Sequence, residues 1–155
     1  MTQTQRSFTI RETAGIPFDG EVFGWLPVMP MALGMLGMFF LPGAWQGVCA
    51  AATAVWGSAI LLFLAGVRRG LSFRTPGGVR AVQLLTMLVY FLWGLASLLA
   101  PLSVSLWMLC LGYAAIALID PIAARRGEAP LYFARLRPVQ MGAAAVIYGA
   151  VALGF

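Results

Sequence analysis

The chain contains no histidine and no lysine, and only 10% of its 155 residues are charged. Without histidine, it lacks a common ligand of haem and related pigments and any Ser/His or Cys/His pair for nucleophilic catalysis. No acidic or basic residue lies deep inside an apolar run, where pumps and coupled transporters carry their ion or proton relays. We therefore predict a protein that is not an enzyme, holds no metal and uses no cofactor.

Cysteine is also scarce, because Cys49 and Cys110 are the only two, and both fall inside apolar runs. A disulfide between them is conceivable if their helices touch, but a single pair makes no disulfide framework. Buried free cysteine behaves as a small apolar residue, which is the interpretation we favour. Met31, Met35 and Met38 recur at helical spacing, and we interpret them as adaptable packing rather than as a Cu(I) site.

Apolar residues are abundant: 61% of the chain is hydrophobic and the mean hydropathy is +0.90. A soluble domain carries about a quarter charged residues and does not bury this much apolar surface. We predict an all-α integral membrane protein, a compact bundle of five transmembrane helices in one domain, 25–155. The predicted spans are roughly 25–41, 47–67, 81–99, 102–119 and 139–153.

A polar N-terminal arm, 1–24, precedes the first predicted span. Gly15, Pro17 and the turn pair Asp19-Gly20 do not suit a long helix, so we expect the arm to be extended. Its scattered apolar residues would allow it to lie across a partner or across the bundle, and a free terminus is the alternative.

All ten basic residues are arginine, and the net charge is +5. In a soluble protein this balance would suggest nucleic acid, but here the arginines flank apolar runs, so we expect anionic membrane lipids and no nucleic acid as partners. Arginine occurs in the arm and in the loops after the second and fourth spans, and is absent from the other two turns. The positive-inside rule then places the N-terminus inside and the C-terminus outside a bacterial inner membrane. The predicted headgroup-binding residues are Arg68, Arg69, Arg74, Arg80, Arg125, Arg126, Arg135 and Arg137.

Asp120 is the only acidic residue at the end of a predicted span, and Pro121 follows it. Aspartate before proline is a helix-start signal, so the carboxylate could cap a new helical segment. The alternative is an ion pair at the membrane boundary, since an ionised carboxylate there is costly unless it is solvated or paired. The topology places four candidate partners on the same side: Arg68, Arg69, Arg80 and Arg137.

Four of the aromatic residues within the predicted spans are candidates for contact with a ligand or with a neighbouring helix. Trp56 is near the middle of its span, where the indole N–H needs an acceptor, so we expect it to face inward, toward a neighbouring helix or a bound molecule. Aromatic walls suit apolar ligands. The candidate residues for an apolar ligand site or for helix contacts are Trp56, Tyr90, Trp93 and Tyr113.

Two segments, 55–70 and 111–138, resemble the small membrane-protein family DUF3429, whose eukaryotic relatives include the mitochondrial transmembrane protein 69. The family patterns are an apolar helix ending in Gly-x-Arg/His-Trp-Gly and a later series of Gly-Tyr, Asp, Pro-x-Tyr and Leu-Arg. Here they stand as Gly66-Val67-Arg68-Arg69-Gly70, with arginine in place of tryptophan, and as Gly112-Tyr113, Asp120, Pro130-Leu131-Tyr132 and Leu136-Arg137. The resemblance implies a compact multi-span protein and carries no established activity.

Two functions are compatible with these features. Ala50, Ala54 and Ser58 stand four apart and form a small-residue ridge on which another helix can pack closely. This favours a non-catalytic accessory or assembly subunit of a larger energy-transducing or transport complex, with other membrane-protein subunits as partners. The alternative is a binding module or carrier for an apolar small molecule such as a quinone, carotenoid or lipid.

The predicted orientation can be tested with a reporter that is active only in the periplasm. Fused after Phe155, the reporter should give a signal, because an odd number of spans separates this end from the arginine-rich arm. Inserted near Gly77, it should give none. The reverse pattern would place the N-terminus outside.

Overall fold

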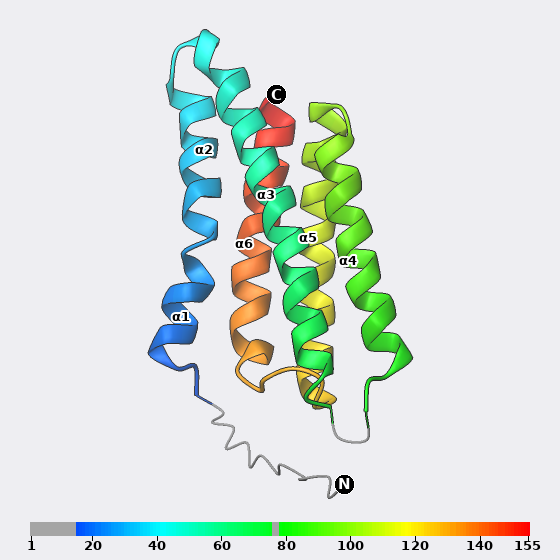
Figure 1. Cartoon of the computed structure of the whole chain (residues 1–155). Helices are drawn as coiled ribbons and strands as arrows, with labels where there is room; N and C mark the ends of the chain where they lie inside the picture. Colours follow the sequence, from blue (N-terminus) through cyan, green and yellow to red (C-terminus); the bar gives the residue numbers. More distant parts are fainter. Residues whose placement is uncertain (1–14, 76–77) are drawn as a thin grey trace, which may run out of the picture.

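The computed structural model describes residues 15–75 and 78–155, and the regular secondary structure of these residues is entirely α-helical (Figure 1). Most of the predicted arm, 1–14, lies outside the described residues. The helices, in chain order, are α1 (Phe18–Trp25), α2 (Val28–Phe40), α3 (Gly43–Ser72), α4 (Ala81–Leu99), α5 (Leu102–Arg125) and α6 (Phe133–Gly154).

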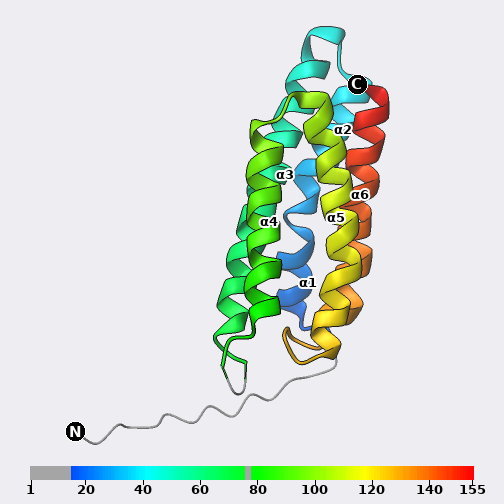
Figure 2. The same cartoon turned by 90° about the vertical axis from the view of Figure 1, so that its right-hand side faces the viewer.

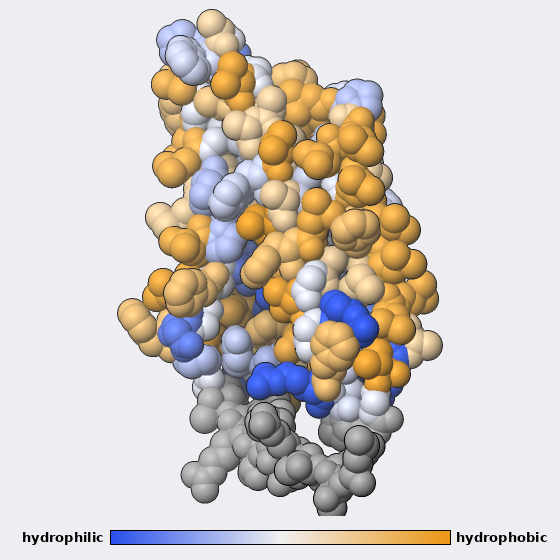
Figure 3. All heavy atoms as spheres, viewed as in Figure 1, coloured by the Kyte–Doolittle hydropathy of each residue, from blue (hydrophilic) through white to orange (hydrophobic). Residues whose placement is uncertain are grey.

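Five helical stretches in these residues are long and apolar enough to cross a membrane, which confirms the predicted five-span, all-α architecture. Helices α1 and α2 follow one another end to end and count as one stretch, Phe18–Phe40, while α3, α4, α5 and α6 each form one. Orange, hydrophobic residues cover most of the face shown in Figure 3, and blue, hydrophilic residues gather toward its lower end. The chain therefore has the architecture of a multi-pass membrane protein.

The last residues of the predicted arm are helical rather than extended. Asp19 and Glu21 lie in the first turn of α1, where negative charge interacts favourably with the helix dipole. The helix ends at Trp25 because Pro27 has no N–H to continue the hydrogen-bond ladder, and α2 begins directly after this proline. The first span is thus a broken helix, and the break is visible between α1 and α2 in Figure 1.

Helix α4 has the predicted bounds, whereas three helices extend beyond theirs at the arginine-rich end. Helix α3 continues to Ser72, α5 continues to Arg125, and α6 already begins at Phe133. Pro121 and Pro138, which lie outside the predicted spans 102–119 and 139–153, lie inside α5 and α6. Each proline removes one backbone hydrogen bond, and the additional turns bring Asp120 and Arg137 to their ion-pair partners.

Gly127 explains where α5 ends. Its φ of 71° lies in the left-handed region that favours glycine. The N–H of Gly127 donates to the carbonyl of Ala124, and the N–H of Glu128 donates to the carbonyl of Ala123. These two bonds form a Schellman motif, which satisfies the last carbonyls of the helix.

The spans close into a ring in which each one packs against its neighbour along the chain, and α2 packs against α6 (Figures 1 and 2). Tyr113 of α5 and Tyr148 of α6 stack inside this ring with their ring centroids 5.4 Å apart. Their hydroxyls donate to the carbonyls of Gly57 and Thr53 in α3, each at 2.8 Å. The centre of the bundle is therefore fixed by packed aromatic rings whose polar atoms are satisfied.

Small residues set the spacing between α3 and its neighbours. The predicted ridge of Ala50, Ala54 and Ser58 is buried, and the hydroxyl of Ser58 lies 3.4 Å from that of Ser97 in α4. Cys49 and Cys110 are both free, so the disulfide alternative is wrong. The two cysteines lie beside different helices: Cys49 is near Gly37 of α2, and Cys110 is near Gly149 of α6.

Gly34 of α2 offers a test of this close packing. A Cβ at this position would lie 1.8 Å from Oγ1 of Thr53, so Gly34→Ala forces the two helices apart. Overpacking of this kind costs about 1 to 3 kcal/mol of unfolding free energy, measurable by thermal unfolding in detergent. Adding Thr53→Ala removes the clashing oxygen and should recover most of the loss.

Gly66 supplies the matched control, because a Cβ there meets nothing within 4 Å. Gly66→Ala should be neutral or should stabilise α3 by about 0.5 to 1 kcal/mol through helix propensity. Equal losses for Gly34→Ala and Gly66→Ala would contradict the packing shown by the structure.

Candidate functional site

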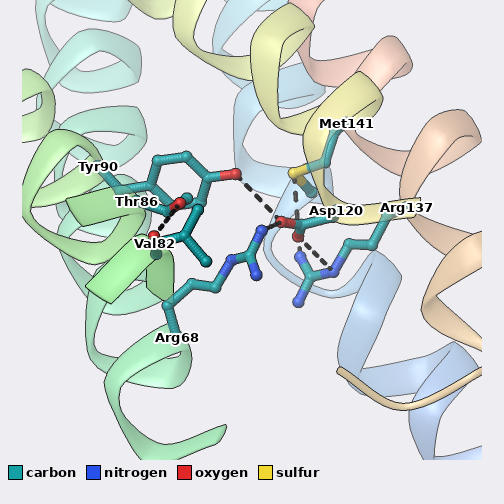
Figure 4. Close-up of polar contacts among 7 residues, drawn as sticks. All are labelled: Arg68, Val82, Thr86, Tyr90, Asp120, Arg137 and Met141. Atoms are coloured by element: carbon teal, nitrogen blue, oxygen red, sulfur yellow. Dashed lines mark hydrogen bonds and ion pairs between the residues drawn. The ribbon is translucent and has the colours of Figure 1, made fainter. Parts of the chain in front are cut away.

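Asp120 lies at the centre of a polar cluster to which four helices contribute (Figure 4). Its Oδ1 is 2.9 Å from Nη2 of Arg68 in α3, and its Oδ2 is 3.6 Å from Nε of Arg137 in α6. The hydroxyl of Tyr90 in α4 donates to Oδ1 at 3.1 Å. We call these four residues the Asp120 cluster.

The geometry decides between the two roles considered for Asp120. Capping of a new helix is wrong, because α5 continues through Asp120 and Pro121 without interruption. Pairing is present, and with two arginines rather than one. All four members of the cluster are at most 8% exposed, so removal of one charge would leave another uncompensated in a buried environment.

Aromatic rings hold the two guanidinium groups in place. The guanidinium carbon of Arg68 is 5.6 Å from the centroid of the Tyr90 ring, and that of Arg137 is 4.5 Å from the centroid of Phe133. Nη1 of Arg137 also lies 3.9 Å from the sulfur of Met141. Cation–π contacts of this type gain strength when they are desolvated, so both arginines are held on two sides.

Two of the predicted headgroup-binding arginines do not lie on the exposed surface. Arg68 and Arg137 are buried in the bundle, because the extended helices place them inside rather than in loops. For the same reason, charged residues that flank the apolar runs lie within α3, α5 and α6. The other predicted arginines are exposed or half-buried at the same end: Arg69, Arg74, Arg80, Arg125, Arg126 and Arg135.

Two of these arginines already have partners within the chain. Arg69 stacks on Phe73 with its guanidinium carbon 4.1 Å from the ring centroid. Nη1 of Arg80 lies 3.5 Å from Oε1 of Glu128, whose side chain is buried. Arg74, Arg125, Arg126 and Arg135 are therefore the better candidates for contact with headgroups.

The four predicted aromatic residues do not form one site. Tyr113 is fully buried at the bundle centre, and Trp56 lies on another side, donating its indole N–H to the carbonyl of Pro27 at 2.9 Å. Trp56 thus has the predicted acceptor, but it is 40% exposed rather than turned inward. Both residues make helix contacts, and only Tyr90 and Trp93 reach a cavity.

That cavity is an apolar cleft between α4 and α5, which lie side by side in Figure 2. Its volume is about 280 Å³. The ring of Trp93 packs against Gly112 of α5, and its indole N–H donates to the carbonyl of Met108 at 2.7 Å. We call it the α4–α5 cleft, and its walls are Leu61, Val89, Tyr90, Trp93, Leu111, Gly112, Ala115, Ile116 and Ile119.

Tyr90 connects the cleft with the Asp120 cluster. Its ring forms part of the cleft wall, while its hydroxyl is turned to the carboxylate of Asp120. Ile119, the residue before Asp120, also lines the cleft. The apolar α4–α5 cleft is therefore adjacent to the buried charges of the Asp120 cluster.

Sequence reasoning missed a second, smaller cavity of about 50 Å³ on the opposite side of the cluster. Arg137 and Gln140 of α6 form its polar wall, and we call it the Arg137 cavity. The amide nitrogen of Gln140 donates to the carbonyl of Gly24, but its Oε1 has no partner among the described residues. The sequence signal that could have indicated this cavity is Gln140, a polar residue three positions after Arg137 in an otherwise apolar helix.

Comparison with protein-family models, with curated proteins and with solved structures found no match to the chain. The resemblance to DUF3429 therefore stays a prediction. Within the described residues there is no group of three or more His, Cys, Asp or Glu side chains arranged to hold a metal ion.

Asp120→Asn tests the importance of the cluster. It keeps the shape of the side chain but leaves two buried guanidinium groups without a counter-charge, which should cost about 3 to 5 kcal/mol of unfolding free energy. The measurement is thermal unfolding in detergent. Glu21→Gln is the matched control, because Glu21 is exposed on α1 and its loss should cost about 1 kcal/mol or less. Similar losses for the two variants would argue against a structural ion pair.

Proposed function

We propose that the protein is a non-catalytic membrane module that holds the chain of an apolar small molecule of the lipid, quinone or carotenoid class in the α4–α5 cleft. The observation that carries this proposal is the cleft itself, whose nine wall residues include no charged side chain. Its volume of about 280 Å³ is just below the roughly 300 to 1,000 Å³ of small-molecule sites. It suits one segment of a long chain, with the rest of the molecule in the bilayer.

The exposure of the cleft walls supports entry from the membrane. Val89 and Leu111 face each other across α4 and α5 and are 49% and 60% exposed, so the cleft opens on the lipid-facing surface. The one hydroxyl at its wall, that of Tyr90, is already bonded to Asp120. The cleft thus offers apolar contact and no reacting group, which favours binding over catalysis.

We place the module in a bacterial inner membrane with the N-terminus inside and Phe155 outside. The support is that all eight arginines of the described residues lie at one end of the bundle. The exposed ones would attract anionic headgroups with about 1 kcal/mol each. Phe155 lies at the opposite end (Figure 1).

An accessory or assembly subunit of a larger membrane complex is the second role we retain. Such a subunit would bind its partners through its lipid-facing surface. That surface is broadly apolar, as any multi-span protein requires, and singles out no residue for a partner. The cleft gives the ligand-binding role a defined location, and we therefore rank it first.

Ala115→Phe tests the binding role. Ala115 is exposed at the wall of the cleft, so the larger ring fills the cleft without entering the core. Wild-type protein purified in mild detergent should retain an apolar compound at a stoichiometric level, and the variant should retain several-fold less. The measurement is mass spectrometry of the lipid-soluble compounds that co-purify.

Ala96→Phe is the matched control, because Ala96 is an exposed alanine of α4 outside the cleft. It should retain the wild-type amount. The proposal fails if wild-type protein carries no stoichiometric compound, or if both variants lose it equally.

A further inference from the structure

The Asp120 cluster carries one positive charge in excess. Two guanidinium groups surround one carboxylate, and both arginines are buried. Glu128, the other buried carboxylate in the described residues, pairs with Arg80 instead. An unbalanced charge is strongly unfavourable in a buried environment unless a counter-ion accompanies it. A bound anion would neutralise this excess charge.

Donor groups of the cluster remain free to bind one. Nε of Arg68 is buried and has no hydrogen-bond partner among the described residues. Nε of Arg137 is likewise without a hydrogen bond, and its contact with Asp120 is a longer ion pair of 3.6 Å. Since guanidinium groups present several N–H donors in a planar fork, they match the oxygen atoms of an oxyanion.

The Arg137 cavity gives an anion a place beside Arg137 and Gln140. Arg137 lines it directly, and Leu64, one helical turn before Arg68, lines it from α3. Phe23 and Phe63 also line it and are 71% and 63% exposed, so the cavity reaches the membrane-facing surface between α1 and α3. Figure 3 shows blue, hydrophilic atoms recessed among hydrophobic ones between α2 and α3.

Gln140 narrows the chemistry of the occupant. The residue is only 2% exposed, and its Oε1 is an acceptor without a hydrogen-bond partner among the described residues. Gln140 lines the same cavity as the guanidinium group of Arg137. The occupant must therefore accept hydrogen bonds from arginine, donate one to Gln140, and carry a single negative charge. A singly protonated phosphate monoester meets all three requirements, because it is a monoanion with one remaining O–H. A phosphate diester or a carboxylate lacks that donor.

We propose that Arg137 and Gln140 bind a singly protonated phosphate monoester group, whose charge balances the excess positive charge of Arg68 and Arg137. Its source is either the headgroup of a membrane lipid, with the acyl chains leaving between Phe23 and Phe63, or free dihydrogen phosphate, the corresponding monoanion, from the water phase. The 50 Å³ of the Arg137 cavity holds the leading oxygen atoms of the group, and the remainder lies in the opening. Binding at this site is independent of the ligand in the α4–α5 cleft.

The test measures the unfolding temperature of the full chain in phosphatidylcholine nanodiscs in chloride-free buffer. One arm adds phosphatidic acid, a second adds inorganic phosphate, and a third adds phosphatidylmethanol, an anionic diester whose headgroup has no O–H. A ligand at about 100 times its Kd should raise the unfolding temperature by about 5 to 10 °C. A rise with phosphatidic acid alone identifies a lipid source, and a rise with inorganic phosphate as well shows that the free anion suffices.

Variants distinguish binding in the Arg137 cavity from binding to the exposed arginines. Val28→Phe fills the cavity from α2 while keeping every charge, and Arg137→Gln removes the excess charge. Either one should abolish the rise. Arg125→Gln with Arg126→Gln removes exposed arginines only and should preserve it. If one of the first two variants does not fold, the other decides.

Three results would overturn the proposal. The first is that the unfolding temperature of the wild-type protein does not rise in any arm. The second is a rise of the same size with phosphatidylmethanol as with phosphatidic acid, which would show that the free O–H is irrelevant. The third is an undiminished rise in Val28→Phe or Arg137→Gln, which would place the anion on the surface.

Discussion

The carboxylate of Asp120 is the point at which four spans of the bundle are joined. It comes from α5 and is contacted by Arg68 of α3, Tyr90 of α4 and Arg137 of α6. Charges at this depth are costly, so the cluster is stable only when all its members are in place. This constraint explains why α6 begins before Pro138, since only then does Arg137 lie on the helix and reach Asp120.

The cluster also separates two cavities with different chemistry. On one side the ring of Tyr90 belongs to an apolar cleft, and on the other side Arg137 belongs to a small polar cavity. Because the hydroxyl of Tyr90 is directed at Asp120, the cleft wall stays apolar although a buried carboxylate lies directly behind it. One buried group of charges thus maintains an apolar site and a polar site within the same half of the bundle.

Much of the fold could be predicted from the sequence. The apolar runs and the turns between them predicted five spans, and α4 has the predicted bounds, with the side chain of Gln83 accepting a hydrogen bond from the N–H of Arg80 at its start and Pro101 just after its end. The importance of Asp120 was also predictable, since an acidic residue at a membrane boundary needs a partner. Its second arginine, the role of Gln140 and the separation of Trp56 from Tyr90 were not, because they depend on how the helices are rotated against one another.

Composition and hydropathy by themselves determined that this chain is a bundle of membrane-spanning helices, because the cost of exposing so many apolar residues to water leaves no alternative. They also determined which end of the bundle carries the arginines. Only the tertiary structure decided which arginines are buried and which face the membrane surface. The physical reason is that local signals such as Asp120-Pro121 describe the preference of one segment, whereas the pairing of Asp120 with Arg68 and Arg137 depends on how distant helices pack against one another.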